Sequence, residues 1–284
     1  MCRLLDTGDY ESIYRSIARL LGIVDADIHS YARERALTHD LDSLCMYCDE
    51  RGHFYEWASD NVEDEENLKI DYVTIYHFAK RLESSDELEG MGLQNLHEIL
   101  LGKNKLIDFL DEYGINFIER NGHIVCLYNG VELDFSHTRE RFNEDTCING
   151  YLFGGNIYDE GEIRHLKNGP EFIQDIENVI NKQIFNGDSS LNLRSEYRRR
   201  SKGFIFKIKV PINELTFDGC GYENEYNVEY NTEEIYKCVG SYLVNQVLHR
   251  GISNRVIRLR DNAKVDADNI LEIIEVSDED LYRY

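Results

Sequence analysis

Four potential metal ligands lie close together near the N-terminus, in the spacing H-x5-C-x2-C-x4-H. They are His39, Cys45, Cys48 and His53. Zinc sites use these residue types, and a Cys-x-x-Cys pair is a common part of such sites. The two cysteines, however, continue the helical spacing of the leucines at 37, 41 and 44, where buried cysteines pack as small apolar residues. We therefore expect this segment to pack into a core and to bind no metal.

A run of basic side chains forms a second group that could do chemistry. Residues 194–209 (RSEYRRRSKGFIFKIK) contain seven basic residues and one acid, in a chain whose net charge is −23. Arginine guanidinium groups bind phosphate oxygens through paired hydrogen bonds, and Tyr197 could stack on a base. The run is therefore either a phosphate-facing patch, for a nucleotide or a nucleic-acid strand, or a solvated turn before a strand.

The first part of the chain has the spacing of helices. Within residues 9–58, the apolar residues at 13, 17, 20 and 21 lie on one face of a helix. Residues 60–66 (DNVEDEE) then contain five acids, which is typical of a solvated linker. We place a boundary there and predict a helical N-terminal domain over residues 1–68, followed by an α+β domain over residues 69–284.

The second part mixes strands and helices without a regular βαβ alternation, which favours the α+β class. Strands are expected at residues 71–78, 203–217, 254–260 and 270–276. Helices are expected at residues 170–184 and 233–248, and as two stretches within 93–110 that break near Gly102. A hairpin should turn at Asn129-Gly130, because this dipeptide suits a two-residue turn.

Composition excludes several classes of protein. The 284 residues are 42% hydrophobic and 11% aromatic, which is incompatible with a disordered chain. No apolar run approaches the roughly 20 residues of a membrane helix. The first residues lack the apolar core of a secretory signal, so we expect a cytosolic protein with reduced cysteines. The excess of 54 acidic over 31 basic residues argues against a protein that coats duplex DNA.

One segment has a family resemblance. His77 stands near the end of a predicted strand, and Met91-Gly92-Leu93 follows after a short intervening segment. This order resembles the opening of ADP-ribosyltransferases, in which a strand histidine holds a ribose of NAD and a Gly-Leu pair follows. A histidine nitrogen can donate to a ribose hydroxyl, and glycine allows close approach of the backbone. The family's Ser or Thr after the histidine is missing, and Ala79 stands in its place.

Later segments are similar to the same family. Residues 148–155 (INGYLFGG) place Tyr151 and Phe153 where the family has an aromatic residue that packs on nicotinamide, and residues 203–217 resemble its central strand. The late carboxylates Glu225 and Glu229 are candidates for the family's catalytic glutamate. Glu196, after Arg194-Ser195, is a third candidate, because it resembles the Arg/Ser/Glu pattern of another branch. Arg194 and residues 198–200 would then face phosphates of NAD or of the target.

The resemblance covers residues 70–284 and implies a split-sheet fold. It also implies NAD-dependent transfer of ADP-ribose to a protein or a nucleic acid, or NAD hydrolysis, in a toxin-like or phage-defence role that a protein inhibitor could control. Structural roles remain open for each residue, because strand histidines and tyrosines often serve packing alone. Which late glutamate acts is also open.

The acid excess supports a different class of function. Residues 265–284 contain seven acids and one basic residue. Such a surface could dock a basic partner or mimic nucleic acid. The alternative to an enzyme is therefore a non-enzymatic, acidic interaction protein.

Overall fold

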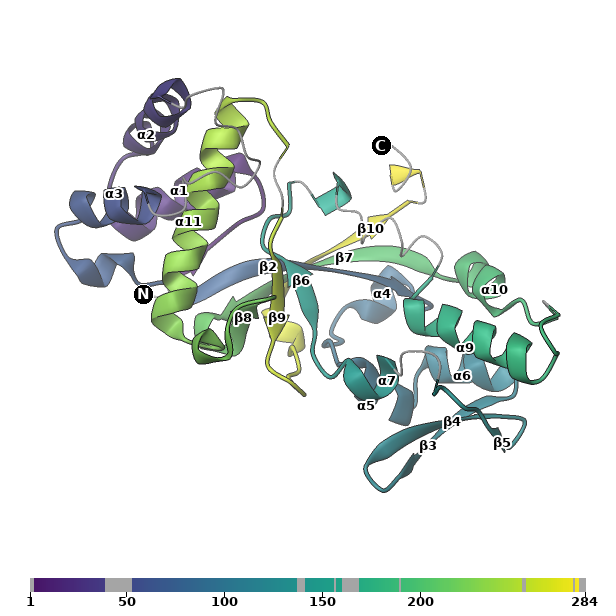
Figure 1. Cartoon of the computed structure of the whole chain (residues 1–284). Helices are drawn as coiled ribbons and strands as arrows, with labels where there is room; N and C mark the ends of the chain where they lie inside the picture. The colour runs from purple at the N-terminus through teal and green to yellow at the C-terminus, as the bar shows by residue number, and fades with distance from the viewer. Residues whose placement is uncertain are drawn as a thin grey trace. The chain divides into compact units, whose positions relative to one another are not determined.

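A computed structural model of the chain describes residues 3–38, 53–136, 141–155, 157–159, 169–188, 190–251, 254–277, 279 and 280. The chain forms two compact units, each assembled from segments that are distant in the sequence. The first unit comprises residues 1–76, 149–157 and 207–260, and the second comprises residues 77–148, 158–206 and 261–284. Helices and strands occur in both units, as expected for the α+β class (Figure 1).

The first unit contains four helices in its described part: α1 (Tyr10–Leu21), α2 (Asp25–Thr38), α3 (His53–Asn61) and α11 (Val228–Val247). Its short strands are β1 (Leu4–Leu5), β6 (Asn149–Tyr151), β8 (Leu215–Phe217) and β9 (Val256–Leu259). The 3-10 turns η1 (Glu65–Leu68), η3 (Ile212–Glu214) and η4 (Tyr222–Asn224) lie between them. Two long strands, β2 (Tyr72–Arg81) and β7 (Lys202–Pro211), contribute to both units.

The second unit contains short helices and a separate hairpin sheet. Its helices are α4 (Ser85–Leu88), α5 (Leu96–Leu101), α6 (Lys105–Glu112), α7 (Arg141–Glu144), α9 (Glu171–Gln183) and α10 (Leu193–Arg200). Its strands are β3 (Ile115–Arg120), β4 (His123–Tyr128), β5 (Val131–Glu132) and β10 (Ile270–Val276). The remaining turns are η2 (Ile157–Asp159) and η5 (Ala267–Asn269).

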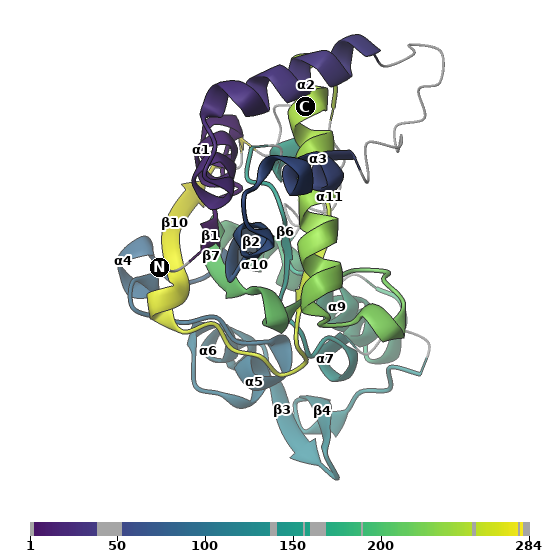
Figure 2. The same cartoon turned by 90° about the vertical axis from the view of Figure 1, so that its left-hand side faces the viewer.

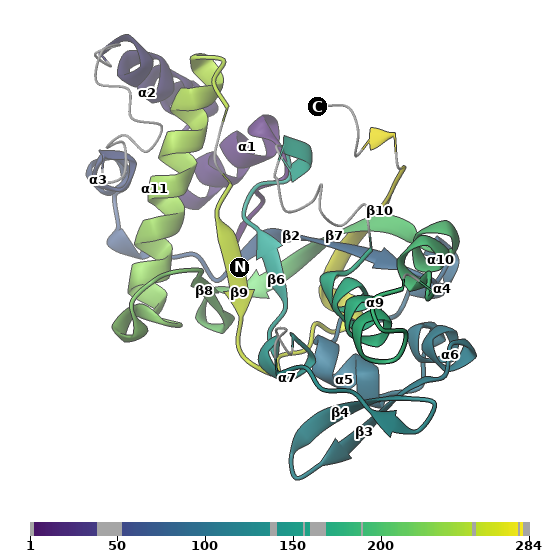
Figure 3. The same ribbon diagram turned by 45° about the vertical axis from the view of Figure 1, so that its right-hand side comes forward.

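Two sheets are formed by the described strands. The larger has the order β10-β7-β2-β6-β9-β8, with β1 paired in parallel to β2. The smaller has the order β3-β4-β5 and is antiparallel. The small sheet lies against α5, α6 and α7 (Figure 3).

Helix α1 follows directly from its sequence. The Asp9 carboxylate accepts a hydrogen bond from the backbone N–H of Ser12 at 2.7 Å, which caps the first turn. Ile13 and Ile17 are fully buried, as the helical spacing predicts. The helix ends at Gly22, whose φ of 73° is the left-handed conformation that glycine adopts at helix ends. The predicted apolar face is thus confirmed.

The late helix α11 packs beside α2 and α3 (Figures 1 and 2). Gly240 in α11 permits this approach, because an added Cβ would overlap the Cβ of Phe54 in α3. The Phe54 ring lies 5.0 Å from that of Tyr31 and 6.1 Å from that of Tyr236. The units therefore divide the chain differently from the linear boundary expected after residue 68: the N-terminal helices share a core with a segment more than 150 residues later.

A buried polar link joins the N-terminal loop to β2. Thr7 donates two hydrogen bonds of 2.8 Å to Thr74, from its backbone N–H to the Thr74 hydroxyl and from its own hydroxyl to the Thr74 carbonyl. Nearby, Asp6 accepts a 2.8 Å ion-paired hydrogen bond from Lys207 of β7. Because buried polar groups are costly unless paired, these contacts fix the register of the loop that precedes α1.

The predicted hairpin at Asn129-Gly130 is confirmed. Tyr128 pairs with Val131, and both turn residues have positive φ, 49° for Asn129 and 78° for Gly130. Positive φ at both positions defines a type I′ turn, which matches the twist of the strands. The preceding hairpin turns in the same way at Asn121-Gly122.

Most other predicted elements are also present. The strand expected from residue 71 is β2, the two stretches within 93–110 are α5 and α6, and the break near Gly102 is the end of α5. The helices expected at 170–184 and 233–248 are α9 and α11. The leucine and cysteine positions from 41 to 48 lie outside the described residues. Leu37 is 86% exposed and does not join a core. None of the described helices has the length and apolar character needed to cross a bilayer.

Candidate functional site

His77 lies at the point in β2 where a run of buried residues ends and alternation of buried and partly exposed residues begins. Residues 73–76 are all buried, whereas from His77 onward half-exposed and buried residues alternate. Because successive side chains of a strand point to opposite faces, His77 and Ala79 share the more accessible face. The centre of the His77 ring lies 6.1 Å from that of Phe206 in β7. The strand therefore fixes this imidazole and leaves part of it open to a ligand.

Tyr151 lies directly opposite Tyr76 in the pairing of β6 with β2. Directly opposite residues share a face of the sheet, whereas His77, the next residue of β2, points to the other face. Tyr151 is 9% exposed. Tyr151 and His77 therefore lie on opposite faces of the sheet. The structure gives no direct support for a nicotinamide ring held between these two side chains.

Phe153 belongs to the core of the first unit. It is 1% exposed, and the centre of its ring lies 4.5 Å from that of Tyr242 in α11. Its backbone is fixed by Asn254, which accepts from its N–H at 2.9 Å and donates to its carbonyl at 2.6 Å. These contacts explain why an aromatic residue stands here without any ligand.

Gly92 makes a close backbone contact within the protein. Leu93 and Val265 form an isolated antiparallel bridge with hydrogen bonds of 2.8 and 2.9 Å. A Cβ at Gly92 would overlap the carbonyl oxygen of Val265. The need for glycine here is therefore explained by chain packing.

Two of the three candidate glutamates are exposed and unpaired. Glu225 follows η4, and Glu229 lies in the first turn of α11. Neither carboxylate forms an ion pair or a hydrogen bond with any part of the chain that the structure describes. Both are thus available to a ligand.

Glu196 is committed to neighbouring arginines. It accepts hydrogen bonds of 3.0 and 2.7 Å from Arg199 and lies 3.8 Å from Arg200. The Arg199 hydrogen bond lowers the pKa of Glu196 below its usual value of 4.5. Arg194 is also paired, with Glu177 of α9, at 2.6 Å. Neither side chain is free for NAD without breaking a contact.

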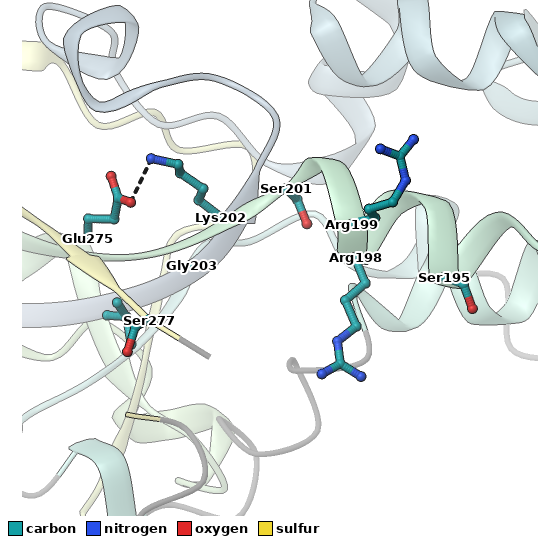
Figure 4. Close-up of a pocket in the computed structure, with 9 residues that line it drawn as sticks. Ser195, Arg198, Arg199, Ser201, Lys202, Gly203, Glu275 and Ser277 are labelled. Carbon is teal, nitrogen blue, oxygen red and sulfur yellow. Dashed lines mark ion pairs between the residues drawn. The ribbon is translucent and has the colours of Figure 1, made fainter. Parts of the chain in front are cut away.

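A cavity of about 510 Å³ lies in the second unit, lined by the end of α10, the start of β7 and the end of β10 (Figure 4). We call it the basic pocket. Its charged lining residues are Arg198, Arg199, Lys202 and Glu275, and its hydroxyl groups come from Ser195, Ser201 and Ser277. Lys202 and Glu275 form a 2.7 Å ion pair. This pair, together with a hydrogen bond from Ser85, lowers the pKa of Glu275.

The predicted site residues are divided between the units. His77, Gly92, Arg194 and Glu196 belong to the second unit, and Tyr151, Phe153, Glu225 and Glu229 belong to the first. The basic run did point to the basic pocket, since Arg198, Arg199 and Lys202 line it. Sequence reasoning missed Glu275 and Ser277, because no local pattern indicates that β10 ends beside a segment some 70 residues earlier.

The potential metal ligands fall largely outside the structure. His39, Cys45 and Cys48 lie outside the described residues, and His53 in α3 lies 4.0 Å from Glu56. Among the residues that are placed, no group of three or more His, Cys, Asp or Glu side chains could hold a metal ion. The absence of a metal stays a prediction.

A scan against protein-family models, a search of curated proteins and a search of solved structures find no match to this chain.

Proposed function

We propose that the protein uses NAD as a substrate and transfers its ADP-ribose group to a macromolecule, a protein or a nucleic acid. The observation that carries this proposal is the position of His77, a half-exposed imidazole on the accessible face of a long strand. A ring nitrogen there can donate a hydrogen bond to a ribose hydroxyl. The sequence resemblance supplies the identity of the substrate and the toxin-like or phage-defence role.

The late glutamates supply the second part of the proposal. Transfer breaks the bond between C1′ of the ribose and the nicotinamide nitrogen, so positive charge builds on the ribose ring. A nearby carboxylate stabilises that charge. The acceptor atom then bonds to C1′ and releases its proton to solvent. Glu225 and Glu229 suit this role better than Glu196, because their carboxylates are not already neutralised by arginine.

Binding and cleavage of NAD test the proposal. With NAD at 100 times its Kd, the free energy of unfolding should rise by about 2.7 kcal/mol. His77→Ala should lower the rate of nicotinamide release by about 10²-fold, because the ribose loses its orientation. His123→Ala is the matched control, since His123 is an exposed histidine on β4. Full activity of His77→Ala, or no effect of NAD on the wild-type protein, would remove the basis of the proposal.

Conservative substitutions separate the three carboxylates. We expect Glu225→Gln or Glu229→Gln to abolish nicotinamide release while NAD binding persists, because the lost charge acts mainly in the transition state. Glu196→Gln should have little effect on either. Loss of activity only in Glu196→Gln would transfer the role to α10.

An acidic interaction protein remains the second candidate, because exposed acids gather from the end of α3 to the start of η1. The acids of residues 60–66 are all exposed. If NAD gives no thermal shift and polylysine binds in a salt-sensitive manner, the second candidate is favoured, since screening weakens attraction between exposed charges.

A further inference from the structure

The basic pocket has no role in the proposed transfer reaction. Its lining residues come from α10, β7 and β10, which all contribute to it from the second unit. A volume of about 510 Å³ is within the range of small-molecule sites. The pocket is therefore large enough for a ligand of its own.

The charge of the pocket favours an anion. Three cations and one acid line it, in a chain whose net charge is −23. The acid, Glu275, is paired with Lys202, but the two side chains are 42% and 56% exposed. Exposed ion pairs contribute little to stability, so an incoming anion can replace the carboxylate of Glu275 at Lys202.

The two arginines of the pocket do not act as one clamp. Arg198 and Arg199 extend from α10 in opposite directions (Figure 4). Arg199 also donates two hydrogen bonds to the carboxylate of Glu196, which compensates its charge. We therefore assign the direct ligand contact to Lys202 and assign no ligand contact to the arginines.

Ser201 provides an independent indication of a ligand. It lies between α10 and β7, and only 9% of its surface is exposed. Its backbone N–H donates to the carbonyl of Tyr197 at 2.8 Å, whereas its hydroxyl has no hydrogen-bond partner among the residues that the structure describes. A buried hydroxyl without a partner is costly, and an acceptor oxygen of a ligand would satisfy it.

The lining also indicates what kind of anion fits. No aromatic ring is among the described residues that line the pocket, and Val276 is its one large apolar residue. A nucleobase would find no stacking surface there. Hydroxyl groups beside cations instead suit the oxygen atoms of a phosphoryl group.

We propose that the basic pocket binds the phosphoryl group of a small polar solute, either free phosphate or a phosphate ester without a base, through Lys202 and Ser201. The proposal is independent of NAD cleavage, because none of these residues belongs to the proposed transfer site.

Calorimetric titration of the full chain with inorganic phosphate, ribose 5-phosphate and ribose tests this assignment. Both phosphates should bind and ribose should not. Equal affinity for the two phosphates would identify free phosphate as sufficient, and about tenfold tighter binding of ribose 5-phosphate would identify an ester. No binding of either phosphate at about 10 mM would overturn the proposal. Binding of a single-stranded oligonucleotide through the same residues, with no binding of ribose 5-phosphate, would also overturn the proposal.

Three variants make the test specific. Lys202→Gln and Ser201→Ala should each weaken phosphate binding about tenfold, by loss of a charge or of a donor. Arg120→Gln is the matched control, because Arg120 forms a comparably exposed ion pair with Glu132 in the hairpin. Without ligand, Ser201→Ala should be at least as stable as the wild type, since it removes an unpaired buried hydroxyl. Unchanged affinity in both Lys202→Gln and Ser201→Ala would overturn the proposal.

Discussion

The guanidinium of Arg194 lies 2.6 Å from the carboxylate of Glu177, a side chain that is only 5% exposed. The backbone N–H of Arg194 donates to the second carboxylate oxygen at 2.7 Å. Because Glu177 belongs to α9 and Arg194 to α10, this pair joins the two helices. A residue that the sequence assigned to NAD phosphates therefore has a structural contact that explains its presence.

This pair predicts a loss of stability. Arg194→Ala should lower the free energy of unfolding by about 1–3 kcal/mol, because a buried carboxylate loses its charged partner but keeps its backbone donor. Arg120→Ala, which breaks an exposed pair, should change it by less than about 1 kcal/mol. Urea denaturation of both variants measures the difference. Equal effects would mean that the Glu177 carboxylate is more hydrated than its burial indicates.

Gly240 in α11 should resist replacement by alanine. Alanine normally stabilises a helix interior by about 1 kcal/mol relative to glycine. Here the added Cβ would overlap Phe54, which is fully buried, and overpacking costs about 1–3 kcal/mol. We therefore expect Gly240→Ala to lower the melting temperature. Gly251→Ala is the control, because none of the described residues has an atom within 4 Å of an added Cβ there. A higher melting temperature for Gly240→Ala would show that α3 can move away from α11.

Cys126 should react only when the protein unfolds. Burial raises the pKa of its thiol to about 12. At pH 8 roughly one molecule in 10⁴ would then carry the reactive thiolate. Mass spectrometry after alkylation should find Cys126 unmodified in the native state and modified in denaturant, whereas the half-buried Cys220 reacts earlier. Alkylation of both at the same rate in the native state would contradict the burial of Cys126.

Glu87 links stability to pH. Its pKa is lowered from 4.5 to about 2, first by a hydrogen bond from Lys105 and then by the backbone N–H of Ser84. Because the pKa of Glu87 is lower in the folded protein than in the unfolded protein, its contribution to stability is fully present at a pH above the unfolded-state pKa. This contribution is lost as the pH falls toward 2. The difference in melting temperature between the wild type and Glu87→Gln should therefore shrink between about pH 5 and pH 2. Lys105→Met should raise the pKa of Glu87, which carbon NMR can follow. A titration midpoint near 4.5 in the wild type would contradict this contact.

Sequence patterns predicted the elements whose conformation is determined by residues close together in the sequence. The hairpin at Asn129-Gly130 was predictable because the turn needs two residues with positive φ. Helix α10 was not predicted, because it has only two buried residues, Leu193 and Tyr197, and three consecutive arginines. Its formation depends on packing against α9. Tertiary contacts of this kind leave no periodic pattern in the sequence.

The candidate site was less predictable than the fold. Residue types identified His77 and the basic run, but spacing along the chain could not reveal that Tyr151 lies opposite Tyr76. A shift of one residue in strand register reverses the face on which each side chain lies. Likewise, the contact of Lys202 with Glu275 joins residues that no local rule connects.

Three Asn-Gly pairs should change chemically when the protein is stored. They are Asn121-Gly122 and Asn129-Gly130 in the hairpin turns, and Asn186-Gly187 after α9. In each, asparagine and glycine both have positive φ. Because glycine has no side chain, the backbone nitrogen that follows asparagine can attack the side-chain carbonyl carbon and close a ring with loss of ammonia. Hydrolysis of that ring leaves a carboxylate, which makes such asparagines thermolabile. Old preparations should therefore contain more acidic isoforms, which isoelectric focusing would resolve. The asparagines that form these turns are thus also the positions at which the stored protein should lose side-chain amides.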